Sequence, residues 1–452
     1  MIEHVYKDLY NQDSIDKQLL IQFDDGQITN EELYSDSVEI LETLCSEDEL
    51  RFGCCESSKI KIKIANVVEQ LKGKWLTVSE TLGGNTSSPF SLGKYKVLSD
   101  VPSGNRNYRE ITAYDALYDV INADVASWYE SLTFPLTQKQ FRASFFDYFG
   151  IDQKEITLIH DDITIKKTID ANSISGKDII TSLCELNGVF GHIGRDGKFE
   201  YISLDKEENN TPIEIDASLY KSCEYDDFVT SNISKLQIRQ EENDIGYVYG
   251  DGDNCYIIED NFLVYGKSSE EMSGICQRLF DKISKVIYRP FKAIIKGNPC
   301  YTIGDSIKIN SRYKVIESYI LERRLSGIQS LFDEIESKGV YEYSEDLNSI
   351  AKDIVRLKGK TNTLERTVEQ TRSEIKDVES NLRTEIKQTA DSVVIEVGKA
   401  VNDLEIGSVN ILRNSTTLDF EDYLFESDVE GDILLDETGL MLADEYGYVL
   451  VG

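Results

Sequence analysis

Histidine is scarce in this sequence, which contains only His4, His160 and His192 in 452 residues. The H-E-x-x-H, G-x-S-x-G and G-x-x-x-x-G-K-[ST] patterns are also missing. The sequence therefore lacks the motifs by which zinc peptidases, serine hydrolases and P-loop proteins are identified. His160 stands beside Asp161 and Asp162, but no second His or Cys lies at a metal-ligand spacing. We therefore expect His160 to lie in a surface loop, and we expect no enzyme: no catalytic residue, no metal and no cofactor.

Cysteine is present without any pattern that would give it a role. There is no C-x-x-C pair and no histidine at zinc spacing. We expect the cysteines to act as buried small apolar residues. They are Cys45, Cys54, Cys55, Cys184, Cys223, Cys255, Cys276 and Cys300.

Long apolar runs and basic charge are lacking as well. No stretch approaches the roughly 18 apolar residues of a membrane span, and Met1 is not followed by a signal peptide, so we expect no membrane span and folding in the cytoplasm. The net charge is −34, from 82 acidic and 48 basic residues. Such a field argues against specific nucleic-acid binding. It suits a surface past which DNA slides without sticking, and it equally suits simple solubility.

Three local patterns favour ordinary structure over a ligand site. The run 250–254 (GDGDN) resembles a calcium loop but lacks the spaced glycine and terminal glutamate, so a hairpin turn is predicted. The aromatic groups at 141–149 and 247–249 could stack on sugars or bases, yet their helical and alternating spacing favours core packing. Trp75 and Trp128 are predicted to be core residues too.

The chain order predicts an α+β multidomain protein. Short period-2 runs such as 59–64 (KIKIKI), separated by Gly, Asp and Asn, indicate antiparallel β structure. We expect two antiparallel β-barrel-like modules, 1–107 and 227–340, to bracket an α+β module at 108–226. A coiled-coil stem at 341–405 and a short β-rich segment at 406–452 follow.

Helix signals lie mainly in the α+β module. Thr137 is a predicted N-cap for a helix that ends at Gly150, and another helix is expected from 175 to 187, followed by Gly188. The segment 189–202 then reads as a hairpin with its turn at 195–197. One further helix is predicted at 268–286.

A narrow apolar seam in the stem predicts self-association. Apolar residues spaced three and four apart need neighbouring helices to cover them. The flanking pairs Asp353 with Lys358 and Lys360 with Glu365 favour parallel packing, whereas Glu374 with Glu379 is repulsive. The residues of the seam do not decide between a two-stranded and a three-stranded coiled coil. The alternative is a long amphipathic helix that packs on the core of its own chain. The predicted oligomerisation residues are Leu347, Ile350, Ile354, Leu357, Leu364, Val368, Ile375, Val378 and Leu382.

Several strings resemble, in order and spacing over about residues 1–330, the tail-tip or baseplate hub proteins of phages and prophages of Gram-positive bacteria. This group includes proteins labelled prophage endopeptidase tail or tail-associated lysin. The strings are 49–55 (ELRFGCC), 111–115 (ITAYD), 175–178 (SGKD), 195–198 (RDGK), and the pair 298–299 (NP) with 304–305 (GD).

The resemblance implies a homotrimeric hub in the virion tail, assembled in the host cytoplasm, whose β modules form a ring that continues the tail tube. It further implies contacts with the distal tail protein, the tape-measure protein and a C-terminal fibre or receptor-binding protein, with DNA passing through unbound. The segment 409–415 (VNILRNS) is similar to segments that open carbohydrate-binding regions in such proteins. The chain ends soon after it, so we expect a docking segment that neighbouring chains or another tail protein complete.

Two other functions fit the sequence less well. A cell-wall peptidase or glycosidase would need a hydrolase domain, and none is evident after the hub-like part. The hub of a contractile injection particle would use the same architecture without delivering a genome.

Overall fold

A computed structural model describes residues 10, 14–34, 36–83, 89–104, 107–204, 212–240 and 245–343. The chain divides into two compact units, Met1–Arg383 and Thr384–Gly452, and every described residue belongs to the first. The predicted coiled coil, with all nine seam residues, and the predicted β-rich segment lie outside the described residues. Both remain predictions.

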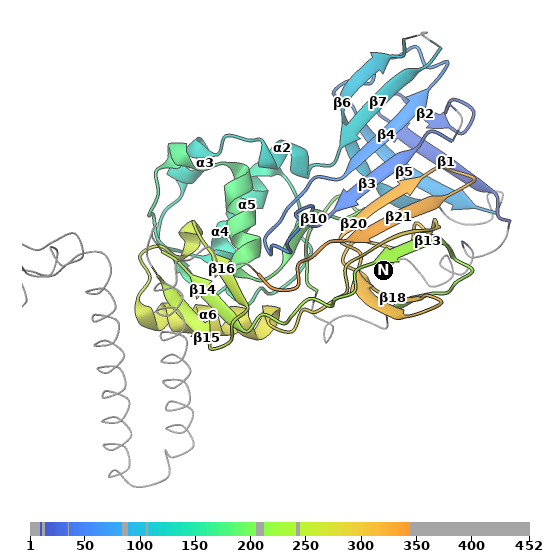
Figure 1. The fold of residues 1–452 in the computed structure, drawn as a ribbon. Coiled ribbons are helices and arrows are strands. Elements are labelled where there is room, and N and C mark those ends of the chain that lie inside the picture. The colour runs from blue at the N-terminus through green and yellow to red at the C-terminus, as the bar shows by residue number, and fades with distance from the viewer. Residues whose placement is uncertain are drawn as a thin grey trace, which may run out of the picture. The chain divides into compact units, whose positions relative to one another are not determined.

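A curved antiparallel sheet dominates the described part of the chain (Figure 1). Among the described residues it contains eleven strands in the order β13-β17-β21-β20-β3-β4-β7-β6-β5-β1-β2. The first seven in the chain are β1 (Lys17–Phe23), β2 (Gly26–Thr29), β3 (Glu39–Thr43), β4 (Lys59–Ile64), β5 (Trp75–Leu82), β6 (Phe90–Pro102) and β7 (Arg109–Tyr114). The other four are β13 (Tyr220–Tyr225), β17 (Phe291–Lys296), β20 (Glu322–Ser326) and β21 (Phe332–Ser337).

One strand pair joins the early and late strands of this sheet. β3 and β20 run antiparallel, with Ile40 opposite Leu325 and Glu42 opposite Arg323. The β strands at the two ends of the described chain are therefore hydrogen-bonded into a single sheet. β13 lies before residue 227, where the second β module is predicted to start, and it pairs with β17, which lies after that residue.

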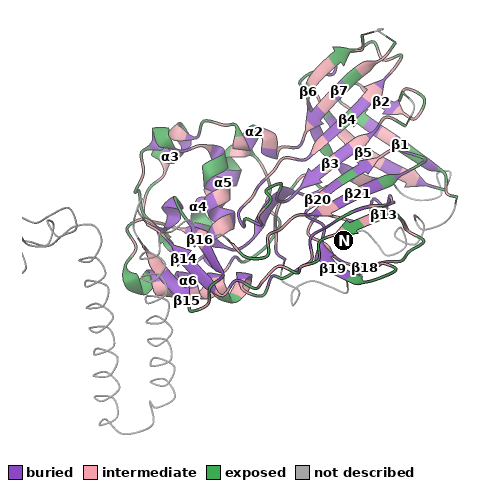
Figure 2. Ribbon diagram, in the orientation of Figure 1, coloured by how far each residue is buried: buried purple, intermediate pink, exposed green. Residues whose placement is uncertain are grey.

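Alternation along the strands explains how the sheet is covered. In β4, Ile60, Ile62 and Ile64 are buried, while the intervening lysines reach the other face. Figure 2 shows the same alternation along neighbouring strands. The predicted period-2 pattern is confirmed here. Lys61 and Lys63 lie 3.4 and 3.6 Å from carboxylates on adjacent strands, a cross-strand charge ladder.

Helices and short strands alternate in the chain between β7 and β13, and the helices lie where they are predicted. They are α2 (Leu117–Ile121), α3 (Ala126–Ser131), α4 (Gln138–Phe149) and α5 (Gly176–Leu186). Thr137 and Ser175 form capping boxes, and Gly150 and Gly188 end α4 and α5 with positive φ. A later helix, α6 (Ser269–Ile283), starts after its Ser268 cap and ends three residues before the predicted 286.

Short strands complete the fold. The predicted hairpin is present as β10 (Phe190–Ile193) and β11 (Phe199–Ile202). β12 (Ile213–Ile215) runs parallel to β18 (Ser306–Asn310), which pairs with β19 (Val315–Tyr319). β8 (Leu136–Thr137) pairs with β9 (Thr164–Ile165), and two 3-10 helices span Ala171–Ser173 and Phe262–Val264.

The predicted hairpin turn at 250–254 is wrong. β14 (Lys235–Ile238) lies between β15 (Tyr247–Gly250) and β16 (Cys255–Ile258), antiparallel to the first and parallel to the second. The segment therefore crosses over β14. Asn254 is buried where the crossover ends, and its amide donates to the carbonyls of Ser231 and Asn232 at 3.2 and 3.1 Å. A short-range turn signal cannot show which strand intervenes.

Two apolar clusters form the core. One lies on the inner face of β1–β7, together with Leu325, Ile328 and Leu331. The other joins the helices, β14 and β16 to the late strands. Trp128 belongs to it, as predicted, but Trp75 is 41% exposed because β5 starts there with its outward-facing positions. Tyr148 is likewise half exposed, on the outer side of α4.

No helix in the described ranges has the length and apolar character needed to cross a membrane.

Candidate functional site

His160 does not lie in a surface loop, so that prediction is wrong. Its side chain is fully buried, and its backbone N–H donates to Asn187 Oδ1 at 3.0 Å. Arg278 of α6 covers the same turn by donating to the carbonyl of Ile159 at 2.7 Å. Burial, reinforced by the positive charge of Arg278, lowers the pKa of His160 to about 3. The imidazole is therefore neutral, and α5 and α6 cover a turn that looks solvent-exposed in the sequence.

The carboxylates beside His160 are held by arginines. Asp161 accepts Arg142 Nε at 2.7 Å and Nη2 at 2.8 Å, with both side chains buried. Asp162, at the surface, accepts Arg278 Nη1 at 2.7 Å. The bidentate geometry of the Arg142–Asp161 pair makes it a strong, directional ion pair within the fold. Within the described ranges, no three His, Cys, Asp or Glu side chains come together as a possible metal site.

All eight cysteines lie in the described ranges as thiols. Five are buried, in agreement with the prediction, whereas Cys54, Cys223 and Cys300 are partly exposed. In the buried environment of α6, the pKa of Cys276 is raised by burial alone. That thiol behaves as a small apolar residue.

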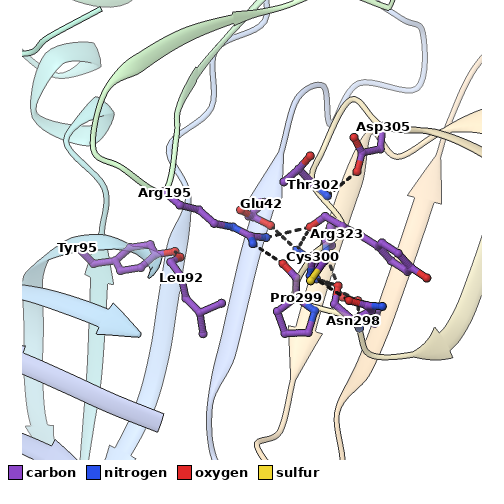
Figure 3. Close-up of polar contacts among 12 residues, drawn as sticks. Glu42, Leu92, Tyr95, Arg195, Asn298, Pro299, Cys300, Thr302, Asp305 and Arg323 are labelled. Atoms are coloured by element: carbon purple, nitrogen blue, oxygen red, sulfur yellow. Dashed lines mark hydrogen bonds and ion pairs between the residues drawn. The ribbon is translucent and has the colours of Figure 1, made fainter. Parts of the chain in front are cut away.

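The most densely bonded polar site is a buried junction around Arg323 of β20. Its Nε and Nη2 donate to the two carboxylate oxygens of Asp333 at 2.9 and 3.0 Å. Nη1 donates to Glu42 at 2.9 Å and to the Tyr301 carbonyl at 2.7 Å, and Nη2 also reaches the Asn298 carbonyl at 3.0 Å. These five contacts match the five N–H donors of a guanidinium. Figure 3 shows Arg323 together with Glu42 and Asn298.

A second arginine enters the junction from the β10–β11 hairpin. Arg195 Nη2 donates to the Tyr301 carbonyl at 2.9 Å, and Nη1 bonds the Pro299 carbonyl. Its own carbonyl accepts Ser91 Oγ of β6 at 2.8 Å. In Figure 3, Arg195 and Arg323 approach the segment 298–300 from different elements. The hairpin, the loop before β18 and the large sheet thus meet at one place.

Electrostatics decide the charge states in this junction. Burial alone would raise the pKa of Glu42, but the nearby guanidinium groups of Arg195 and Arg323 outweigh it and the pKa is lowered. The pKa of Arg323 is raised by Asp333 and Glu42 in spite of burial. Glu42 and Arg323 therefore stay ionised inside the protein. Burial raises the pKa of Asp333, although the adjacent Arg323 guanidinium opposes this shift.

The loop between β17 and β18 is shaped to fit the junction. Asn298 N–H donates to Asp333 at 3.0 Å, and Cys300 N–H donates to Asn298 Oδ1 at 3.1 Å. Thr302 N–H donates to Asp305 at 2.8 Å, which is a local side-chain turn. These bonds aim the carbonyls of the loop at the two arginines. The arrangement can hold the loop, the hairpin and the large sheet together.

One surface hollow has a volume of about 240 Å³ and lies over the late strands of the sheet. It is lined by Lys221, Ile294, Arg324, Ser326, Phe332 and Glu334. Sites for small molecules are usually larger, about 300 to 1,000 Å³.

Sequence reasoning missed Arg323 and Asp333, although a signal exists. In β20, Arg323 is two residues from Leu325 and lies on the same buried face of the strand. In β21, Asp333 lies on the same buried face as Ile335. Opposite charges at core-facing positions of two runs separated by a short turn indicate a buried pair. Arg195 lies in a string that carries the family resemblance, but its partners could not be inferred from spacing.

No known family model and no curated protein matches the sequence. Among solved structures, the 43 kDa tail protein of prophage MuSo2 from Shewanella oneidensis is similar at 12% identity and a TM-score of 0.48, over 71% of this chain and 96% of that one. Prophage tail protein gp18 from Listeria monocytogenes EGD-e matches at 13% identity and a TM-score of 0.47, over 72% and 95%. A tail protein from Neisseria meningitidis MC58 matches at 8% identity and a TM-score of 0.46, over 72% and 98%. These TM-scores are too low to carry an argument about this chain.

Proposed function

We propose that this protein is a structural subunit at the tip of a bacteriophage tail, the hub that closes or extends the tail tube. One observation carries the proposal. Four of the five strings that together give the sequence its resemblance to tail-tip hub proteins are linked in the fold, one pair directly and the others through residues beside a string. Such strings are individually short, but a set that converges in space behaves as one structural unit.

One contact joins two strings directly, and the others join a string to a residue that lies close to another string. Arg195 of the string 195–198 bonds the carbonyl of Pro299 in the string 298–299. In the string 49–55, Gly53 N–H donates to the Val189 carbonyl at 2.9 Å, and Cys55 forms a β-bridge to Gly191, four residues before Arg195. Asp115, which ends the string 111–115, accepts the N–H of Ser58 at 2.8 Å. Through these contacts the strings link the segment between β3 and β4, the end of β7, the β10–β11 hairpin and the loop before β18.

This construction suits a part that transmits load and does no chemistry. β3–β20 pairing and the Arg323 junction tie the early and late strands together through hydrogen bonds and buried charges. Breaking a buried charge pair costs about 3 to 5 kcal/mol, so the elements move as one body. A tube component has to keep its shape while its neighbours pull on it.

Assembly follows from the stem. We infer that residues 347–382 hold three copies in parallel through the nine seam residues, and that the β modules form a ring in the virion tail. The ring would contact the distal tail protein and the tape-measure protein, and the segment 406–452 would dock a fibre or receptor-binding protein. The net charge of −34 lets DNA pass without sticking.

Light scattering of the full-length chain tests the assembly. We expect the mass of three chains, and a compact single chain would overturn the proposal. Leu364→Asp combined with Val368→Asp places charges in the seam and should give single chains. Ser373→Asp lies at an outward heptad position of the same stem and should leave the mass unchanged.

Electron microscopy tests the role. Negatively stained full-length protein should show a ring with a projecting stem. An antibody against the protein should label the end of the tail on phage particles that carry it. Label on the capsid or along the whole tail would contradict a place at the tip.

A further inference from the structure

Two cysteine sulfurs lie in contact within the segment that connects β3 to β4. Cys45 and Cys54 are nine positions apart, and their Sγ atoms are 3.6 Å apart. A disulfide needs its sulfurs at about 2.05 Å, so a shift of roughly 1.5 Å separates the thiol pair from a bond. Cys45 is buried, whereas Cys54 is partly exposed. A small reagent can therefore reach the pair from the Cys54 side.

The chain between the two cysteines is held by hydrogen bonds to distant elements. Phe52 N–H donates to the Tyr256 hydroxyl at 2.9 Å, and Gly53 N–H donates to the Val189 carbonyl at 2.9 Å. The Leu50 carbonyl accepts the Tyr343 hydroxyl at 2.8 Å. At the other end, Leu44 N–H, next to Cys45, donates to the Leu321 carbonyl at 2.8 Å. Because both ends of the segment are held, the sulfurs already lie close together in the native fold.

The proton on the pair is unevenly shared. The Cys54 thiol hydrogen bonds to Cys45 and lowers the pKa of Cys45, while the same bond, with burial, raises the pKa of Cys54. The pair thus holds a thiolate at Cys45 more readily than an isolated buried thiol would. Thiolates are the reactive form of cysteine.

We propose that Cys45 and Cys54 are a modification site at which a peroxide oxidises the two thiols to a disulfide. The Cys45 sulfur attacks one oxygen of hydrogen peroxide, the O–O bond breaks, and Cys45 becomes a sulfenic acid as one water is released. The Cys54 sulfur then attacks the Cys45 sulfur, the S–O bond breaks, and a second water leaves with the Cys54 proton. Two thiols and one peroxide give one disulfide and two waters, with the same product whichever sulfur is oxidised first.

The fold supplies an internal comparison. Burial raises the pKa of Cys55, and a side-chain hydrogen bond with Cys184 raises it further. Both of these cysteines are buried, so neither offers an exposed route. We expect them to stay reduced under conditions that link Cys45 to Cys54. The inference depends on the described fold alone and not on the proposed role in a phage tail.

Peptide mapping of the full-length protein tests this. Native protein is treated with hydrogen peroxide, its remaining thiols are blocked with N-ethylmaleimide in denaturant, and it is digested with trypsin without reduction. Cleavage after Arg51 separates Cys45, in peptide 18–51, from Cys54 and Cys55, in peptide 52–59. We expect these two peptides to appear joined, and to separate again after dithiothreitol. Cys184 lies in peptide 178–195 and should carry the blocking group.

Variants identify the sulfur involved. Cys54→Ser should abolish the joined peptide, and Cys55→Ser, one residue away in the same peptide, should retain it. Full labelling of Cys45 and Cys54 in peroxide-treated wild-type protein would overturn the proposal, and this result needs no variant to fold. A link between 52–59 and 178–195 in place of the expected one would overturn it as well.

Discussion

Arg323 stands opposite Ile335 in the register of β20 and β21, yet its guanidinium grips Asp333, two residues earlier on β21. The diagonal reach lets the same guanidinium also meet Glu42 on β3 and two loop carbonyls. One side chain on β20 thereby bonds β21, β3 and the loop before β18.

Replacing Arg323 tests this relationship. Arg323→Lys keeps the charge but has no planar fork, so it leaves Asp333 or Glu42 without a partner in a buried site. We expect a loss of about 3 to 5 kcal/mol of unfolding free energy, measured by urea denaturation. Arg324→Lys, at the next residue and exposed beside Glu334, should change it by less than about 0.5 kcal/mol. Equal effects would show that the junction is not a stabilising feature.

Gly53 tests the close approach of the segment 45–54 to α5. Its φ is +90°, and an added Cβ would lie 2.5 Å from Glu185 Cβ. Gly73 has a similar φ of +84° with open space around it. Gly73→Ala should therefore cost about 1 to 2 kcal/mol for backbone conformation alone, and Gly53→Ala should cost about 1 to 3 kcal/mol more through the clash. Thermal unfolding of the two variants compares them directly, and indistinguishable midpoints would contradict this packing.

His160 predicts how stability depends on pH. Its pKa is about 3 in the fold, against an ordinary value of 6.5. The unfolded chain therefore binds a proton below pH 6.5 that the folded chain refuses. The stability of the folded form is fully present above pH 6.5 and declines as the pH falls towards 3, at up to about 1.4 kcal/mol per pH unit.

His160→Leu isolates this effect. Glu80 and Glu185 have pKa values raised from 4.5 to about 7, chiefly by burial. Their effect is opposite to that of His160, because the stability that they contribute declines as the pH rises from 4.5 to 7. Both glutamates are present in the wild type and in the His160→Leu variant, so their contributions cancel in the difference between the two unfolding free energies. We expect the gap in unfolding free energy between variant and wild type to move in favour of the variant as pH falls from 6.5 to 4.5. A constant gap would show that His160 is protonated in the fold.

Asp161 and Asp162 are adjacent but differ in setting. Asp161→Asn should strand the buried charge of Arg142 and cost about 3 kcal/mol or more. Asp162→Asn, in an exposed pair with Arg278, should cost less than about 1 kcal/mol. Chemical denaturation of both variants measures the difference. If both substitutions left stability intact, a role for this acidic pair outside the fold would have to be considered.

Local signals in the sequence predicted local structure well. The Thr137 and Ser175 caps, the glycines that end α4 and α5, and the 189–202 hairpin are set by a few neighbouring residues, and the fold has them. Non-local features could not be read in this way. Nothing near Ile40 indicates that its partner is Leu325, and nothing near His160 indicates that α6 covers it.

The alternation of inward and outward positions along a strand predicts which side chains are buried. Arg323 and Asp333 break the apolar alternation of their strands at matching core-facing positions. Trp75 was assigned to the core by residue type, although its parity in β5 is that of the outward positions. The direction of a side chain in a strand predicts burial better than its hydrophobicity does when the run is short.

The pairing of β3 with β20 has a consequence for synthesis. Glu42 and Arg323 are 281 residues apart, so β3 emerges from the ribosome long before the strand that covers its open edge. Until residue 326 is made, that edge can accept a strand from another nascent chain. Translation speed and chaperone supply should therefore limit the yield of this protein more than the stability of its finished fold does.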